Sequence, residues 1–123
     1  MSNKICLVVD DDSSVRRFVK TVLRCDGFET CEAIDGLQAL GLIRSLGGVL
    51  DLLVSDIQMP IMDGITLASF LGAEFPDIPI VLISGSSEIE ELSDACLLVH
   101  KPFSPETLLK TVKQAMMQRA DRC

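Results

Sequence analysis

The sequence has 123 residues, of which 48% are apolar, and its formal net charge at pH 7 is −7. This length and composition fit one folded domain and exclude a disordered chain. The acidic balance argues against direct binding to nucleic acid or to an anionic membrane surface. We find neither a signal peptide nor an apolar run near the roughly 20 residues that cross a bilayer, so we expect a cytoplasmic protein.

Short apolar runs alternate with amphipathic segments along the chain. Their apolar and β-branched residues predict strands at residues 5–9, 28–33, 52–55, 80–83 and 96–99. Apolar residues at helical spacing predict helices from residue 13, around 37–43, around 67–75, around 89–92 (a short one) and from residue 105. This alternation predicts an α/β fold with a five-stranded parallel sheet and helices on both faces.

The first predicted helix has an apolar stripe that includes Phe18, and its basic residues turn away from the core. Asp12 or Ser13 suits the N-cap of this helix, and Ser104 suits that of the last. Leu37 is the first apolar residue that marks the second helix. The five cysteines form no CxxC pair, which argues against a disulfide framework and against a zinc site.

Polar side chains follow four of the predicted strands. Asp10 and Asp11 follow the first strand, Asp56 the third, Ser84 the fourth and Lys101 the fifth. Ligands of open parallel sheets bind at the carboxyl ends of the strands. Crowded carboxylates repel one another unless a cation joins them, and oxygen ligands suit Mg²⁺. A phosphoryl group would complete such a site, with one carboxylate as the nucleophile and with Lys101 and Ser84 facing its oxygens.

Four short motifs lie at these strand ends in a fixed order. They are LVVDD at 7–11, SD at 55–56 followed by MP at 59–60 and MDG at 62–64, ISG at 83–85, and KPF at 101–103. Together they resemble the receiver domain of two-component response regulators, the CheY-like family, over almost the whole chain. The resemblance implies a flavodoxin-like strand order of 2-1-3-4-5. It also implies that residues 1–123 form a single receiver domain, with no effector domain in this chain.

The resemblance assigns a role to each residue of the site. Asp56 is the phosphoacceptor, Lys101 contacts the phosphoryl group, and Ser84 is the switch hydroxyl. Asp10, Asp11 and Asp56 bind Mg²⁺ together with the backbone carbonyl of Gln58, and Lys101–Pro102 is a cis peptide. The phosphoryl group comes from a phosphohistidine on a sensor histidine kinase or histidine phosphotransfer protein. The chain is then not an enzyme but a signalling domain that catalyses its own phosphorylation and slow dephosphorylation.

Two departures from the family pattern leave alternatives open. Ser84 and Lys101 are 17 positions apart, which is about one helical turn shorter than usual and predicts a short fourth helix. Leu98 stands where the family has a switch aromatic, so we expect switching through residues 84–91 instead. A receiver-like interaction module that works without phosphorylation is the first alternative. A Mg²⁺-dependent phosphohydrolase is the second, but it needs an acid where this chain has Gln58.

Overall fold

Five parallel strands form one sheet in the part of the chain that this computed structural model describes, residues 3–85 and 96–120. The strands are β1 (Ile5–Val9), β2 (Glu29–Ala33), β3 (Leu52–Asp56), β4 (Ile80–Ser84) and β5 (Cys96–His100). Their order in the sheet is β2-β1-β3-β4-β5, which confirms the order that the resemblance implied. Every strand boundary lies within one residue of its predicted place.

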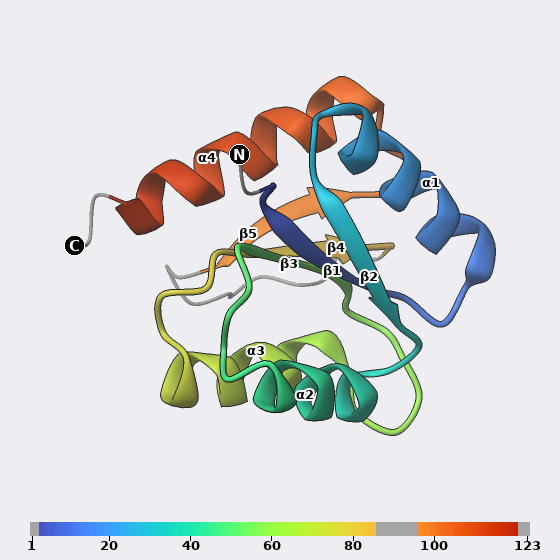
Figure 1. Ribbon diagram of the computed structural model, residues 1–123. Coiled ribbons are helices and arrows are strands. Elements are labelled where there is room, and N and C mark those ends of the chain that lie inside the picture. The colour runs from blue at the N-terminus through green and yellow to red at the C-terminus, as the bar shows by residue number, and fades with distance from the viewer. Residues whose placement is uncertain (1–2, 86–95, 121–123) are drawn as a thin grey trace.

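Helices cover both faces of the sheet (Figure 1). The helices α1 (Ser13–Cys25) and α4 (Pro105–Ala120) lie on one face, and α2 (Gly36–Ser45) and α3 (Gly64–Glu74) lie on the other. The short helix predicted around 89–92 falls outside the described residues. None of the described helices is both long enough and apolar enough to span a membrane.

The core consists of two apolar layers, one on each side of the sheet. Neighbouring residues of a strand point to opposite layers, so Leu7 packs with the α2–α3 layer and Val8 with the α1–α4 layer. Strands β3 and β4 are buried along their whole length, because helices cover both of their faces. No disulfide joins the cysteines at 6, 25, 31 and 96, which lie in the described part of the chain.

Two apolar helix residues are more exposed than their positions predicted. Phe18 is 40% exposed, and its ring packs against Phe103 with the centroids 5.7 Å apart. Leu37 is 55% exposed. The buried face of α2 begins at Gly36 instead, whose N–H donates to the carbonyl of Met62 at 3.0 Å. A Cβ at residue 36 would lie 2.6 Å from that oxygen, so the close approach of α2 to the loop after β3 requires a glycine.

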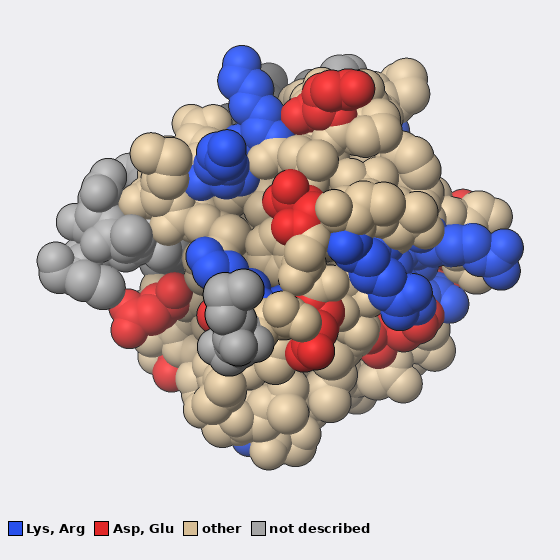
Figure 2. Space-filling model, turned by 45° about the horizontal axis from the view of Figure 1, so that its top comes forward, with Lys and Arg blue, Asp and Glu red and all other residues tan. Residues whose placement is uncertain are grey.

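All four described helices begin at a capping side chain. Asp12, Asp35 and Asp63 accept hydrogen bonds from backbone N–H groups in the first turns of α1, α2 and α3. Ser104 accepts one from the N–H of Thr107 in α4, as predicted. Figure 2 shows a face on which acidic and basic side chains are interspersed. Helix capping thus explains the presence of three of the aspartates near the carboxyl edge of the sheet. Asp10, Asp11 and Asp56 lie at the same edge but do not cap these helices.

Candidate functional site

The register of the sheet brings together the three aspartates that cap none of the described helices. Val9 at the end of β1 pairs with Ser55, so Asp10 follows β1 beside the position of Asp56 in β3. Carboxylate oxygens of Asp10, Asp11 and Asp56 all lie within 4.8 Å of one another. Parallel strands end at the same edge of a sheet, so residues far apart in the sequence form one acidic cluster.

Asp10 is the most enclosed member of this cluster, with only 1% of its surface exposed. Its Oδ1 accepts the N–H of Asp12 at 2.9 Å. Its Oδ2 is buried and has no hydrogen-bond partner within residues 3–85 and 96–120. Burial raises the pKa of Asp10 to about 6, and repulsion from Asp56 adds to the rise. A buried carboxylate oxygen without a partner is costly, which makes this position receptive to a cation.

Asp56 is buried beside the ammonium group of Lys101. Burial raises the pKa of Asp56, and attraction to Lys101 opposes that rise without cancelling it. Lys101 Nζ lies 3.4 Å from Asp56 Oδ1, and the lysine side chain stays partly exposed. The cluster therefore combines three carboxylates with one cation that reaches solvent.

Strand β5 supplies this lysine across the end of β4, which lies between β3 and β5 in the sheet. The N–H of Lys101 donates to the carbonyl of Ser84 at 2.8 Å, and Ser84 itself is buried. The Lys101–Pro102 peptide is cis, as predicted. These contacts bring Lys101, Ser84 and Asp56 to the same end of the sheet.

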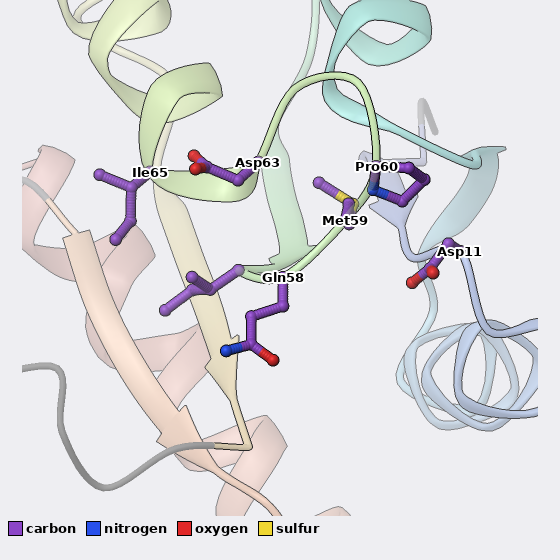
Figure 3. A pocket seen from close by; sticks show the side chains of 7 residues that line it. Asp11, Gln58, Met59, Pro60, Asp63 and Ile65 are labelled. Atoms are coloured by element: carbon purple, nitrogen blue, oxygen red, sulfur yellow. The ribbon is translucent and has the colours of Figure 1, made fainter.

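An open cavity of about 620 Å³ adjoins the acidic cluster (Figure 3). Asp11 contributes to one wall, and the loop that follows β3 contributes the other. Gln58 extends from this loop into the opening. The lining residues are Asp11, Ile57, Gln58, Met59, Pro60, Asp63 and Ile65. The cavity therefore reaches the acidic cluster at Asp11.

The loop after β3 is held by close backbone contacts. The N–H of Gly64 donates to the carbonyl of Ile57 at 2.8 Å. A Cβ at residue 64 would lie 2.3 Å from the backbone oxygen of Asp56, so only glycine lets α3 start this close to the phosphoacceptor candidate. Ile61 has a φ of 70°, which is strained for a β-branched residue.

The sequence analysis missed one side chain that touches the acidic loop. Arg16 was expected to turn toward solvent, but its Nη1 donates to the backbone oxygen of Asp10 at 2.7 Å. Its Nε donates to Glu32 Oε1 at 2.6 Å. The signal in the sequence was a basic residue in the first turns of a helix that follows an acidic loop, but the helical spacing alone assigned it to the outer face.

The comparisons with known proteins agree with this geometry. The sequence matches the family described as response regulator receiver domain over residues 6–113. The sensor kinase CckA of Brucella abortus is 38% identical over 120 residues, which cover 94% of this chain and 13% of the kinase. The DNA-binding response regulator MtrA of Mycobacterium tuberculosis is 34% identical over 120 residues, which cover 94% of this chain and 51% of MtrA. The chain thus spans about half of MtrA and a smaller part of CckA.

Solved structures give the same assignment. The receiver domain of the hybrid histidine kinase CckA superposes with a TM-score of 0.78 at 34% identity, covering 91% of this chain and 98% of that domain. A CheY-like receiver domain protein of Methanospirillum hungatei has a TM-score of 0.88 at 24% identity, covering 99% and 100% of the two chains, and supports the fold alone. The chain belongs to the response regulator receiver domains of two-component systems.

Proposed function

We propose that this receiver domain takes a phosphoryl group onto Asp56 from a phosphohistidine of a sensor histidine kinase or a histidine phosphotransfer protein. One observation carries the proposal: three carboxylates lie within 4.8 Å of one another, and the Lys101 ammonium lies 3.4 Å from Asp56. Lone acids and surface lysines are common, but their joint position at the ends of three strands gathers carboxylates and an ammonium group around one point, as phosphoryl transfer requires. Membership of the family supports the same chemistry.

The acidic cluster fits a hard divalent cation. Asp10, Asp11 and Asp56 offer carboxylate oxygens, which are the ligands that Mg²⁺ prefers. Among the residues that the structure describes, none donates a hydrogen bond to the buried Oδ2 of Asp10. We assign Asp10, Asp11, Asp56 and the backbone carbonyl of Gln58 as the residues that would hold Mg²⁺. When bound, Mg²⁺ supplies positive charge that neutralises the carboxylates and phosphoryl oxygens.

The transfer step uses the carboxylate of Asp56 as its nucleophile. One oxygen of Asp56 forms a bond to phosphorus while the bond between phosphorus and the imidazole nitrogen breaks. The electron pair of the broken bond stays on the imidazole of the donor. Lys101 faces the incoming group and attracts its anionic oxygens, because charge-assisted hydrogen bonds are the stronger kind. The product is an acyl phosphate on Asp56.

The phosphoryl group then changes the charge balance of the site. It adds about −1.5 to −2 charges. We propose that Lys101 and the hydroxyl of Ser84 respond to this charge, and that the surface which follows them changes its affinity for partners. Residues 86–95 follow Ser84 in the chain and lie outside the described structure, so switching through 84–91 stays a prediction.

The phosphodonor must contact the rim of the site, because its phosphohistidine has to reach Asp56. A mostly apolar hollow of about 350 Å³ lies on this rim next to Lys101. It is lined by Ser14, Val15, Phe18, Lys101, Pro102 and Phe103. Phe18, which is partly exposed, lines this hollow, and the hollow provides an apolar contact for the donor beside the site of transfer.

Intact mass measurement tests the proposal. Incubation with a small acyl phosphate and Mg²⁺ should add one phosphoryl group to the protein and none to Asp56→Asn. The matched control is Asp63→Asn, which alters an acid at the cavity but leaves the cluster intact and should still be labelled.

Two outcomes would contradict the proposal. Labelling that persists in Asp56→Asn would place the phosphoryl group on another residue. A wild-type protein that folds and binds Mg²⁺ but gains no mass would favour the interaction module that works without phosphorylation. Continuous release of inorganic phosphate from many small phosphate esters would instead favour the phosphohydrolase.

A further inference from the structure

Arg16 joins helix α1 to the backbone of the acidic loop. Its Nη1 donates to the carbonyl oxygen of Asp10 at 2.7 Å, and its Nε donates to Glu32 Oε1 at 2.6 Å. The arginine side chain is only 15% exposed. One guanidinium group therefore connects α1 and β2 to the peptide that follows β1.

The contact with Asp10 determines the geometry of the next residue. The N–H of Asp10 donates to the carbonyl of Ala33 at 3.1 Å, and the carbonyl of Asp10 accepts from Arg16. Because a peptide unit is planar, a fixed Asp10 carbonyl also fixes the Cα of Asp11. The position from which Asp11 extends its carboxylate thus depends on Arg16, although no hydrogen bond or ion pair joins the two side chains within the described residues.

Glu32 holds the guanidinium in place from β2. Its Cα pairs with Val8 of β1, whose side chain packs on the α1–α4 face of the sheet. Its second carboxylate oxygen binds Lys20 of α1, and this contact and the one with Arg16 lower the pKa of Glu32. Arg16 is thus held by an acid that is charged at neutral pH and shared with a second helix residue.

We propose that Arg16 is a positioning residue for the cation site, acting on Asp11 through the Asp10 carbonyl. The inference rests on the proposed function, because it concerns the same Mg²⁺ site. The bond between Arg16 and the Asp10 carbonyl would then increase the affinity of the site for Mg²⁺. Groups that orient the ligands of a metal commonly change its affinity by about 10- to 100-fold when they are removed.

The charge of Arg16 and its bond to the Asp10 carbonyl have opposite expected effects on Mg²⁺ affinity. As a cation near an acidic site, Arg16 repels Mg²⁺, so loss of its charge alone would tighten binding. Loss of its bond to the Asp10 carbonyl frees the Asp10–Asp11 peptide and weakens binding. Arg17 is the matched control, because it is the next residue of α1 and is exposed. Its side chain makes no hydrogen bond or ion pair with the rest of the described chain.

Titration of the metal-free full chain with Mg²⁺ by isothermal calorimetry tests the inference. We expect Arg16→Ala to raise the Kd about tenfold. Arg17→Ala should leave the Kd unchanged or slightly lower it. Arg16→Lys restores a donor for the Asp10 carbonyl and should recover part of the affinity. In the metal-free protein, the amide resonance of Asp11 should shift in Arg16→Ala and stay in place in Arg17→Ala.

The possible outcomes separate this inference from the proposed function. A wild-type protein without Mg²⁺ binding would overturn both. Mg²⁺ binding by the wild type, with Arg16→Ala as tight as Arg17→Ala, would overturn the role of Arg16 alone. If Arg16→Ala does not fold, Glu32→Ala tests the same point, because it releases the guanidinium from β2. An unchanged Kd in folded Glu32→Ala would then overturn the inference.

Discussion

Two loops border the acidic cluster, and they are held in different ways. The loop at residues 10–12 is fixed by side chains: the carboxylate of Asp10 binds the N–H of Asp12, and Arg16 binds the carbonyl of Asp10. The loop at residues 57–63 is fixed by close backbone approaches that need glycine at residues 36 and 64. The first loop therefore depends on charges that mutation can tune, whereas the second depends on the absence of side chains.

We expect the largest effect on stability from a side chain introduced at residue 64, where α3 approaches the backbone of Asp56. Gly64→Ala sets a methyl group against the backbone oxygen of Asp56, and it should lower the free energy of unfolding by about 2 kcal/mol or more. Urea denaturation followed by circular dichroism measures this loss. Gly72→Ala is the control in the same helix, because no atom lies within 4 Å of the added Cβ. It should stabilise the protein by about 0.5–1 kcal/mol, and equal behaviour of the two variants would disprove the close approach.

Replacing an acid in the first loop should lower the Mg²⁺ affinity, whereas replacing one in the second loop should lower the stability. Asp11→Ala removes a proposed ligand and should weaken Mg²⁺ binding by more than the about tenfold expected for Arg16→Ala. Asp63→Ala removes the N-cap of α3 and should cost about 1 kcal/mol of stability, with the Mg²⁺ affinity retained. Calorimetric titration and thermal unfolding of both variants check the division. Loss of Mg²⁺ affinity in both would show that the loops act as one unit.

The smallest effect concerns the ion pairs that support the first loop. Lys20 and Arg16 lower the pKa of Glu32 below its ordinary value of 4.5. Their stabilisation is therefore fully present above that value and is lost as the pH falls through the lower pKa of the folded state. Because the Glu32 side chain is 44% exposed, we expect less than about 1 kcal/mol. We would measure the free energy of unfolding of wild type and Glu32→Gln between about pH 3 and 7, a range that includes the ordinary pKa of a glutamate. The two free energies should converge at the acidic end. A difference that stays constant with pH would contradict the assignment.

The sequence predicted those features that follow from strand ends and periodicity. Asp10, Asp11 and Asp56 meet because parallel strands end at one edge, which the alternation of strands and helices already implied. Ser104 was recognised as a cap, and Asp12 as one of two candidates beside Ser13, because their residue types and positions suit that role.

Features that depend on tertiary approach were not predicted. The contact between Arg16 and the Asp10 carbonyl depends on a rotamer and on Glu32 in a neighbouring strand, neither of which helical spacing encodes. The backbone contact of Gly36 with Met62 and the exposure of Leu37 at the start of α2 were likewise not predicted. Leu98 is partly buried against the core, and switching without an aromatic residue stays a prediction.

The proposed cation site would link folding to cation concentration through the Asp10 oxygen that has no partner in the described part of the chain. The unfolded chain does not gather Asp10, Asp11 and Asp56, so a cation held by all three binds the folded chain alone. Free cation at 100 times its Kd would then add about 2.7 kcal/mol to the stability of the domain. The melting temperature would accordingly rise with the magnesium concentration, and the carboxylate cluster proposed for phosphoryl transfer would also couple the stability of the fold to the ionic composition of the solution.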